Sequence, residues 1–361
     1  MLTRVPYVSV GIVAILAVAC ASGGGLSAKK DAARSSAAER MDAIRRAQVW
    51  APTDVASMDM RTGPKGRGSF TWHETVDCSY REKAMSGHSP KFTCVIAPDD
   101  DVKVKFGREN GEVYAEVAAT RLFWALGFPA DRMYPVRVVC TDCPAGREDV
   151  REKGAVVFDP ASIERKLKGW AIETTPDSGW AWSELDKVDE SAGGAPRAQR
   201  DALKLLAVFV QHTDNKPEQQ RLLCEDEKSD EGRSHCAHPV MMVNDLGQTF
   251  GRANRFNRDH ISSVNLENWS QKHVWSDARL CVGDLPRSQT GSLENPHISE
   301  AGRKFLSDLL MQVTDAQLRD LFDVARFAER KEGHLRAGSV DEWVDAFKQK
   351  RGEIASRTCP S

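Results

Sequence analysis

An aspartate and a lysine, two residues apart, follow directly on an apolar run of the chain. The run is "ALKLLAVFV" at 202–210, and the polar stretch "HTDNKPEQQ" begins at His212. Asp214 could take a proton from a hydroxyl group, and Lys216 could neutralise a nearby anion such as a phosphoryl group. The same residues could instead cap the end of a helix and form a turn, which "DNKP" would serve well.

A second candidate acid lies in the stretch "MMVNDLGQTFG". An apolar run ends there in Asn244 and Asp245, shortly before Gly247. A carboxylate at the end of a strand and next to a glycine is a common arrangement for binding a metal ion, and a plain strand–turn is the alternative.

Two lysines alternate with apolar residues in "VKVKFG" at 102–107. In a strand, Lys103 and Lys105 share one face and the apolar residues the other. The lysine face could be an ordinary solvated surface, or it could direct an ammonium group into a cleft as a phosphate ligand. Glu116 follows on the next predicted helix, one turn from both Val113 and Thr120, so that it can face the sheet.

The predicted elements that position these residues divide the chain into a strand-rich and a helical part. Short alternating stretches predict strands within 69–107, and 133–140 and 154–159 predict two more. The predicted helices are 111–128, 195–211, 299–313, 314–333 and 339–355, the last two opening with capping boxes. This pattern predicts an α+β fold of two lobes, a small strand-rich lobe at 61–160 and a larger helical lobe at 161–361, with a cleft between them.

The first 20 residues have the character of an export signal. "VSVGIVAILAVA" is an apolar run too short for a comfortable membrane span, and Cys20 follows it within a small-residue stretch. Cys20 resembles the lipidated cysteine of a bacterial lipoprotein, with a non-lipidated signal as the alternative. We therefore expect a chain exported to the bacterial cell envelope and anchored to the membrane by lipid, with a tether and an Ala/Arg-rich helix at 21–60.

Eight cysteines remain once Cys20 is set aside, and an even number in an exported chain indicates disulfides. Sequence proximity suggests the pairs Cys78–Cys94, Cys140–Cys143 and Cys224–Cys236, which leaves Cys281–Cys359. "CTDC" at 140–143 could alternatively be redox-active or half of a metal site, although no second CxxC completes one. "CEDEKSDEGRSHCAH" could offer Cys224, His235, Cys236 and His238 to a metal, with a bridged acidic hairpin as the preferred interpretation.

The composition excludes one class of partner. The 361 residues are 41% hydrophobic and 28% charged, with a formal net charge of −2. A protein that coats nucleic acid needs an excess of basic residues, so we expect no nucleic-acid partner.

The candidate residues occur in the order of the parts of a protein kinase. "HTDNKPEQ" resembles the kinase catalytic loop H-R-D-x-K-P-x-N over eight positions, and "DLG" resembles D-F-G. "AEVAATRL" and "HTDNK…NDLG" are similar to segments of the atypical kinase-like group of HipA, the phosphatidylinositol 3/4-kinases and the secretory-pathway Golgi kinases. The chain also resembles a family of bacterial exported lipoproteins with "KVKFG", "EVAATRL", "DNK" and "DLG-x-TFG". The resemblance covers roughly residues 70 to 335 at the level of motifs.

The resemblance implies a role for each charged residue. Lys105 would hold the α- and β-phosphates of a nucleotide, with Lys103 as a further phosphate ligand, and Glu116 would pair with Lys105. Asp214 would accept the proton of the attacking hydroxyl group, and Lys216 would steady the transferred phosphate.

The resemblance also implies a metal site and a phosphate-covering loop. Asp245 would bind Mg²⁺ or Mn²⁺, and Gln219 stands where kinases place a metal-binding Asn, one methylene further out. Gly87, near the tip of "KAMSGHSP", lies in the loop that would cover the phosphates, although that loop lacks the kinase glycine pattern. "GPKGRG" at 63–68 has a better glycine spacing but precedes the first strand.

Two classes of function follow, with coincidental motifs in a structural lipoprotein as a third. The first is a phosphotransferase that uses ATP or another nucleotide with a divalent metal and acts on a protein, lipid or glycan, or a nucleotidyl transferase on the same scaffold. The second is a pseudokinase-like binding module. A charged residue is present at each of the four motifs, namely the strand lysine, the helix glutamate, the stretch "HTDNKPEQ" and "DLG", and this favours the enzyme. Gln219 and the scarcity of ATP outside a bacterial cell favour the binding module.

Overall fold

The computed structural model describes most of the chain beyond the N-terminal region. The described residues are 35–85, 87, 89–144, 150–152, 154–226, 236–251, 263–287, 291–330 and 336–360. Residues 34–361 form one compact unit. The expected export signal and Cys20 lie outside the described residues. No helix within the described ranges is both long and apolar enough to cross a membrane.

The strand-rich part is a barrel-like sheet. Its strands are β1 (Glu74–Arg81), β2 (Lys91–Ile96), β3 (Asp100–Phe106), β4 (Arg132–Thr141), β5 (Val150–Glu152) and β6 (Ala155–Arg165). The strand order is β3-β2-β1-β4-β6-β5, and a further pairing of β3 with β6 closes the sheet. Apolar side chains such as Val76, Val104 and Val138 fill the interior. The alternation of β3 therefore turns Lys103 and Lys105 to the outer face of this sheet.

Helix α2 (Gly111–Ala125) joins the sheet to the helical part. Every residue of the helix except Trp124 is buried. A helix that is apolar on all sides packs on several elements at once, and α2 packs on β4 and β6 as well as on α6 (Asp315–Val324). A charged residue on such a helix is forced into the interior, which is where Glu112 and Glu116 lie.

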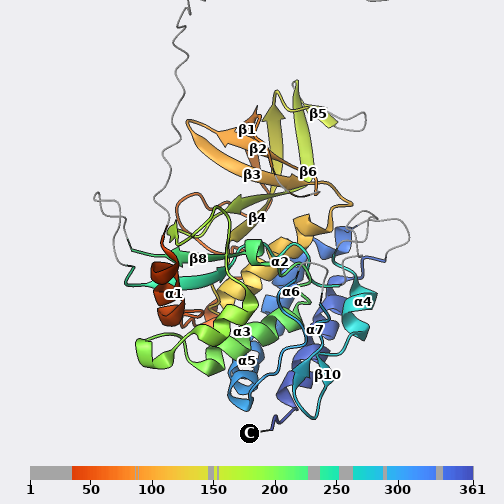
Figure 1. Ribbon diagram of the computed structural model, residues 1–361. Helices are drawn as coiled ribbons and strands as arrows, with labels where there is room; N and C mark the ends of the chain where they lie inside the picture. Colours follow the sequence, from red (N-terminus) through yellow and green to blue (C-terminus); the bar gives the residue numbers. More distant parts are fainter. Residues whose placement is uncertain are drawn as a thin grey trace, which may run out of the picture. The chain divides into compact units, whose positions relative to one another are not determined.

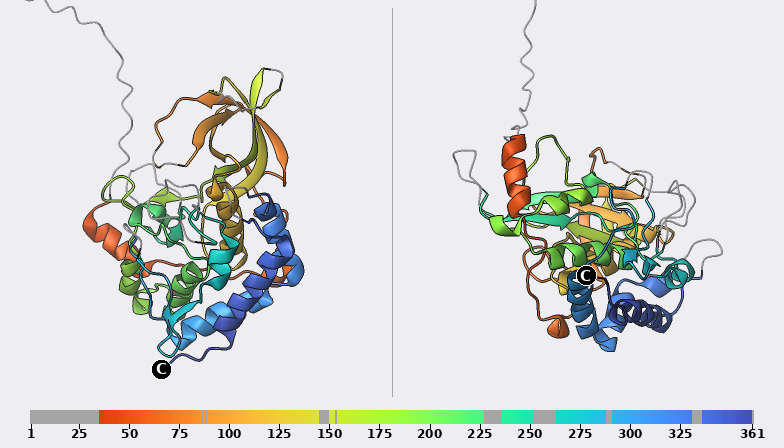
Figure 2. Two further views of the ribbon diagram at one scale, coloured as in Figure 1. Left: turned by 90° about the vertical axis from the view of Figure 1, so that its right-hand side faces the viewer. Right: turned by 60° about the horizontal axis from the view of Figure 1, so that its bottom comes forward.

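The helical part contains most of the remaining elements (Figure 1). Its helices are α3 (Arg197–Phe209), α4 (Leu266–Gln271), α5 (Glu300–Gln312), α6 and α7 (Val340–Ala355). Helices α3, α5, α6 and α7 gather at the end of the unit opposite to the barrel-like sheet, and the views of Figure 2 agree on this. The hairpin of β10 (Trp275–Asp277) and β11 (Val282–Gly283) lies beside them.

A small sheet in the helical part carries the second candidate acid. Its strands are β7 (Trp170–Ala171), β8 (Gln220–Cys224) and β9 (Pro239–Val243), in the order β7-β8-β9. Strand β9 is fully buried and ends at Val243, directly before Asn244 and Asp245. Sequence analysis anticipated the apolar run of β9 but not β8, because the residues "QRLLC" show no alternation and follow the polar loop directly.

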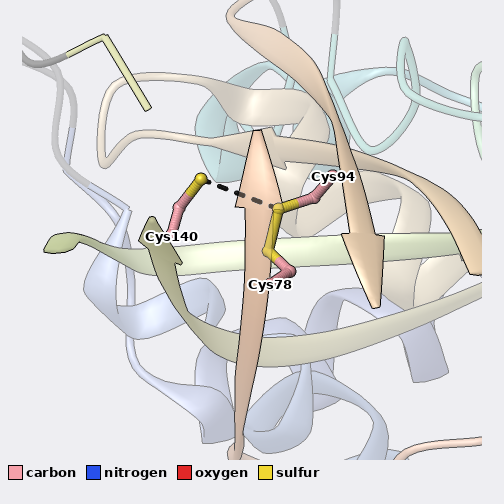
Figure 3. A group of neighbouring side chains, drawn as sticks. All are labelled: Cys78, Cys94 and Cys140. Carbon is pink, nitrogen blue, oxygen red and sulfur yellow. Dashed lines mark hydrogen bonds between the residues drawn. A yellow bond between two sulfur atoms is a disulfide. The ribbon is translucent and has the colours of Figure 1, made fainter. Parts of the chain in front are cut away.

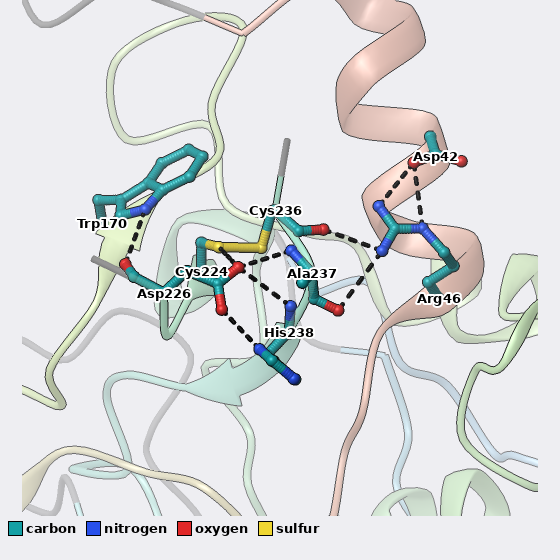
Figure 4. The surroundings of a disulfide bond; sticks show 8 residues. All are labelled: Asp42, Arg46, Trp170, Cys224, Asp226, Cys236, Ala237 and His238. Carbon is teal, nitrogen blue, oxygen red and sulfur yellow. Dashed lines mark hydrogen bonds and ion pairs between the residues drawn. A yellow bond between two sulfur atoms is a disulfide. The ribbon is translucent and has the colours of Figure 1, made fainter. Parts of the chain in front are cut away.

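The β8–β9 hairpin is closed by the disulfide Cys224–Cys236 (Figure 4). The Asp226 carboxylate accepts hydrogen bonds from the backbone amides of Ala237 (2.6 Å) and His238 (3.3 Å). Arg46 on α1 (Ala37–Arg46) donates to the Cys236 carbonyl at 2.9 Å. The hairpin is thus tied both within itself and to the first helix.

The structure has four disulfides, which join the pairs that sequence proximity suggested: Cys78–Cys94, Cys140–Cys143, Cys224–Cys236 and Cys281–Cys359. These bridges leave none of the eight cysteines as a thiolate ligand, so the alternative metal sites at "CTDC" and at Cys224 and Cys236 lose their sulfur ligands. His235 lies outside the described residues.

Two predicted elements differ from the observed ones. The predicted helix at 314–333 ends at Val324, because Arg326 adopts a left-handed conformation (φ 60°) and hydrogen-bonds to Asp159 and Glu329. The expected first strand, predicted from residue 69, begins only at Glu74, after a turn at 71–74 that the Glu74 carboxylate closes on Thr71. The predicted α+β class, strand-rich first and helical afterwards, is confirmed.

Residues 50–64, which include a short 3-10 helix at Val55–Ser57, form a strap that holds α2 in place. Trp50 Nε1 donates to the Leu126 carbonyl at 2.7 Å, and the fully buried Arg121 of α2 donates to the carbonyls of Met60 and Arg61. Gln317 of α6 donates to the carbonyls of Val55 and Met58 at 2.8 Å. The strap therefore connects the C-terminal part of α2 to α6.

Candidate active site

The centre of the candidate site is the ammonium group of Lys105 on β3. It lies 2.7 Å from Glu112 Oε2 and 2.8 Å from Glu116 Oε1, both on α2. Asp245 Oδ1, after β9, is 3.7 Å away. The Lys105 side chain is 1% exposed, so three carboxylates from two elements neutralise one buried cation. The structure thus brings together Lys105, Glu116 and Asp245, three of the residues that the sequence singled out.

Burial and charge set the protonation of this cluster. Burial raises the pKa of Glu116 well above its usual value, with Lys105 opposing the shift and the Asp245 charge adding to it. Burial would likewise raise the pKa of Asp245, but Lys105 and a hydrogen bond from Glu116 lower it below its usual range. The pKa values of the two neighbouring carboxyl groups are therefore shifted in opposite directions, that of Glu116 upward and that of Asp245 downward.

Glu112 connects three parts of the site. Besides Lys105, its carboxylate accepts a hydrogen bond from Gln248 Nε2 at 2.9 Å and one from Ser89 in the loop before β2. Burial and the Asp245 charge oppose ionisation, yet Lys105 and the hydrogen bond from Ser89 lower the pKa of Glu112. A Cβ at Gly247 would lie 2.8 Å from Glu112 Cγ, so the glycine of "DLG" makes room for this side chain.

Asp214 lies in a loop that Asn215 anchors. The buried Asn215 side chain donates to the His212 carbonyl at 2.8 Å and accepts from the backbone amides of Ser292 and Leu293 at 2.8 Å. With Asn215 turned inward, Asp214 and Lys216 on either side of it reach the surface of a cleft. Helix α3 ends at Phe209 and Gln211 adopts a left-handed conformation (φ 54°), so the loop that follows leaves the helix direction and exposes the acid and the lysine.

Gln219 and Lys216 both contact Asp214. Gln219 Nε2 donates to Asp214 Oδ2 at 2.9 Å, and Lys216 Nζ lies 3.5 Å from the same oxygen. The Gln219 carbonyl accepts from the Asn244 amide at 2.8 Å and from the Asp245 amide at 3.3 Å. The loop that carries Asp214 is thus hydrogen-bonded to the segment that carries Asp245.

A ladder of polar side chains on β2, β3 and β6 forms the sheet side of the cleft. The register places Lys105 between Lys91 on β2 and Ser162 on β6, and it places Lys103 opposite Glu164. Lys103 forms an ion pair with Glu164, so its charge is already compensated.

Lys91 has no comparable compensation. Its nearest polar contact is Ser89 Oγ at 3.5 Å, and no carboxylate of the described residues forms an ion pair with it. Burial, with the neighbouring charge of Lys105, lowers the pKa of Lys91. It is therefore a half-buried cation in the cleft wall that an anion would stabilise.

The loop before β2 lies over Lys91. Gly87 has φ 84°, and a Cβ built on it would lie 2.7 Å from Lys91 Nζ. The loop backbone can approach the ammonium group this closely because the residue has no side chain. In the alternative glycine segment at 63–68, Gly63 lies against Arg121 and Gly68 against Arg165, which explains these two glycines by packing.

Most of these groups border one cleft of about 2550 Å³. Its lining includes Asp214, Lys216, Gln219, Asn244 and Asp245 from the helical part. From the sheet side and α2 it includes Gly87, Lys91, Lys103, Glu112 and Glu164. Lys105 and Glu116 lie behind this wall, almost fully buried. The described lining contains no aromatic side chain, so a ligand here meets mainly charged and polar groups.

Sequence analysis missed three residues of the site. Glu112 lies one helical turn before Glu116, a spacing that could have identified it. Asn244 is next to Asp245, and its Oδ1 is buried without a partner among the described atoms. Lys91 gave no such signal, because only the strand register shows that it stands beside Lys105.

Comparisons with known proteins show a distant structural likeness. No protein-family model matches the chain, and no curated protein matches it in sequence. Among solved structures, the chain is similar to a Helicobacter pylori proinflammatory kinase, CtkA, with 11% sequence identity and a TM-score of 0.41. The match covers 79% of this chain and 95% of that one. The proposals below rest on the geometry of the site and not on this likeness.

Proposed function

We infer that the protein is a kinase-like phosphotransferase that uses a nucleotide and a divalent metal. One observation carries the proposal: the buried Lys105 holds carboxylates from α2 and from the end of β9, and Asp214 opens into the same cleft. If the loop at 212–220 served only to end a helix and form a turn, the protein would not need these charged groups beside it. Burying them is costly unless they are paired, and a functional site is the usual reason for bearing that cost.

The oxygen donors at the end of β9 suit a hard cation. Asp245 offers a carboxylate and Asn244 a buried amide oxygen that lacks a partner among the described atoms. Mg²⁺ and Mn²⁺ prefer such ligands, and Mg²⁺ usually takes its remaining ligands from water and substrate phosphates. Within the described residues, the only groups of three Asp, Glu, His or Cys with converging ligand atoms contain disulfides. A cation would therefore be held by few protein groups, which is usual when a nucleotide completes the site.

The residues of the chain divide the work of phosphoryl transfer. Asp214 would take the proton from the acceptor hydroxyl as its oxygen attacks the terminal phosphorus, and the nucleoside diphosphate would leave. Lys216, at 3.5 Å from Asp214, would bind the oxygens of the transferred group. Lys91 would bind phosphate oxygens from the sheet side, whereas Lys105 would hold Asp245 in position. The bound metal would neutralise the phosphate oxygens.

A thermal-shift and calorimetric screen tests this proposal directly. ATP, GTP and ADP are each added with Mg²⁺, with Mn²⁺ or with EDTA. A nucleotide at a hundredfold excess over its Kd should stabilise the protein by about 2.7 kcal/mol, and EDTA should remove most of this gain. If no nucleotide with either metal raises the Tm, the cleft does not bind nucleotides and the proposal is wrong.

A second candidate function is a catalytically inactive binding module. A hydrogen bond from the Gln219 amide to Asp214 favours this function. Gln219 stands where kinases have a metal-binding Asn, and here its side chain is bound to the proposed proton acceptor instead. The ligand of such a module would still be anionic, because Lys91 remains uncompensated in the cleft.

The variant Gln219→Asn distinguishes the two functions. The shorter side chain releases Asp214 and restores the metal-binding residue of kinases. In an active enzyme, phosphotransfer or nucleotide hydrolysis should be preserved or increased. In an inactive module, hydrolysis should be absent in the wild type and should appear, if at all, only in the variant. Hydrolysis that the wild type shows and Gln219→Asn abolishes would mean that Gln219 itself serves the reaction.

We also propose that the protein acts at the bacterial cell envelope. The export signal and lipid anchor at Cys20 would place the enzyme at the bacterial cell envelope, where its acceptor would be a protein, lipid or glycan. An acceptor on the membrane surface would suit a lipid-anchored enzyme, because enzyme and acceptor would be held close together on the same surface.

A further inference from the structure

Two disulfides are in contact inside the barrel-like sheet (Figure 3). Cys78–Cys94 links β1 to β2, and Cys140–Cys143 closes the turn after β4. The sulfur of Cys140 lies 3.7 Å from the sulfur of Cys94, and neither residue is exposed. At this distance the sulfur atoms are in van der Waals contact.

The third sulfur of the group belongs to Cys78. The sulfur atoms of Cys78, Cys94 and Cys140 all lie within 4.8 Å of one another. Cys78 and Cys140 are also direct partners in the parallel register of β1 and β4. A thiol at Cys140 would therefore begin within reach of a disulfide and without competition from solvent, the arrangement that thiol–disulfide exchange requires.

Strand geometry decides which sulfur can be attacked. Strand β1 lies between β2 and β4. A bridge from Cys94 to Cys140 would span two strand spacings, about 9.5 Å, which exceeds the reach of a disulfide, about 7 Å between Cα atoms. A bridge from Cys78 to Cys140 spans one spacing, about 4.8 Å, and fits. The direct pairing of Cys78 with Cys140 in the register of β1 and β4 therefore favours an exchange that joins these two residues and releases Cys94.

We propose that the Cys140–Cys143 and Cys78–Cys94 disulfides form a thiol–disulfide exchange site within the sheet. A dithiol reductant first reduces Cys140–Cys143 and is itself oxidised to a disulfide. The Cys140 sulfur then attacks Cys78, the Cys78–Cys140 bond forms, and the Cys78–Cys94 bond breaks. The proton of Cys140 passes to Cys94, which leaves as a thiol. The product has one disulfide, Cys78–Cys140, and free thiols at Cys94 and Cys143.

The exchange moves the covalent tie from one edge of β1 to the other. In the starting state β2 is covalently bonded to β1, and in the product β1 is bonded to β4 and β2 has no covalent bond to another strand. Strand β2 begins at Lys91, so the exchange loosens the strand that carries the uncompensated cation of the cleft. The exchange itself does not depend on the proposed phosphotransferase function.

Two variants, each with one cysteine replaced by serine, test the exchange. Cys143→Ser leaves Cys140 as a free thiol beside the bridge, whereas Cys140→Ser, the matched control, leaves Cys143 free without the contact to Cys94. Each protein is incubated at mildly alkaline pH, alkylated, and mapped by peptide mass spectrometry without reduction. Cys143→Ser should show alkylated Cys94 and a Cys78–Cys140 bridge. Cys140→Ser should show alkylated Cys143 with Cys78–Cys94 intact.

The outcome that overturns the proposal is alkylation of Cys140 alone in Cys143→Ser, with Cys78–Cys94 unchanged. If the variant does not fold, the wild-type protein can be titrated with limiting dithiol, and mapping of its free thiols then tests the exchange. Free thiols at Cys94 and Cys143 support exchange, whereas free thiols at Cys140 and Cys143 with Cys78–Cys94 intact contradict it. Cys78, Cys94 and Cys140 fall on separate tryptic peptides, so the bridges are distinguishable.

Discussion

Replacing Asp214 by Asn is expected to abolish turnover while leaving nucleotide binding nearly unchanged. The amide has the shape of the carboxylate but cannot take the proton of the acceptor hydroxyl. A positioned general base contributes about 10²–10⁴-fold to a rate, and we expect a loss of kcat of that size. Because Asp214 is not among the groups that hold Lys105, the affinity for nucleotide and metal should change by less than about twofold, or about 0.4 kcal/mol.

Asp245→Ala should give the opposite pattern. It removes the carboxylate proposed to hold the metal, so nucleotide affinity in the presence of Mg²⁺ should fall by more than about tenfold, equivalent to about 1.4 kcal/mol. Affinity in EDTA should change little. Titration calorimetry with and without metal measures both values for each variant.

Asp177→Asn provides the matched control for Asp214→Asn, because Asp177 also lines the cleft but contacts none of the proposed catalytic groups. Its turnover and affinity should remain those of the wild type. If Asp214→Asn retains turnover, or loses no more than the control, Asp214 is not the proton acceptor and the loop has only a structural role.

The parts of the site that follow from local periodicity were predictable from the sequence. Alternation placed Lys105 on the outer face of its strand, and the helical repeat turned Glu116 toward the sheet. Asp214 and Asp245 each follow an apolar run that had to be buried, so their positions at the ends of α3 and β9 were determined locally. The disulfide pairs could also be predicted from the sequence, because three of the four join cysteines that are close in sequence.

The remaining parts depend on pairing between distant segments. Lys91 is a candidate only because β2 pairs with β3 in the register that sets it beside Lys105. The Cys140–Cys94 contact requires β4 to lie parallel to β1, a pairing that joins strands far apart in sequence. No single-sequence pattern encodes such a register, because many registers satisfy the same apolar alternation.

The strap at 50–64 could likewise not be predicted from the sequence. Its contacts with Arg121 and Gln317 are hydrogen bonds to backbone carbonyls, which carry no signature in residue type. They matter for function because α2 supplies Glu112 and Glu116. The strap therefore helps to keep these carboxylates at Lys105.

Replacing Lys91 by Met is expected to weaken the binding of polyphosphate ligands more than any other single change on the sheet side of the cleft. Lys105 is neutralised by three carboxylates and Lys103 by Glu164, so Lys91 is the cation of this ladder that remains for an anion. A hydrogen bond to a charged group contributes about 1.5–3 kcal/mol, which corresponds to a loss of roughly tenfold to 150-fold in affinity. Binding of adenosine, which has no phosphate, should not change.

Tripolyphosphate is the decisive probe, because it carries the charge of a nucleotide without the base. Calorimetry should show the same loss for tripolyphosphate as for ATP in Lys91→Met. Lys168→Met is the matched control, since Lys168 is an exposed lysine of the same cleft. If both variants lose affinity equally, the effect is general electrostatic attraction and not a contact at Lys91.

A second variant separates the position of the charge from its presence. Gly87→Ala keeps Lys91 but places a methyl group 2.7 Å from its ammonium nitrogen, at a φ of 84° that side chains rarely adopt. The loop or the lysine must then move, so affinity for tripolyphosphate should fall by less than in Lys91→Met but by more than in Lys168→Met. An unchanged affinity in Gly87→Ala, alongside a loss in Lys91→Met, would mean that the lysine binds phosphate without the loop. The loop would then have no part in covering the phosphates.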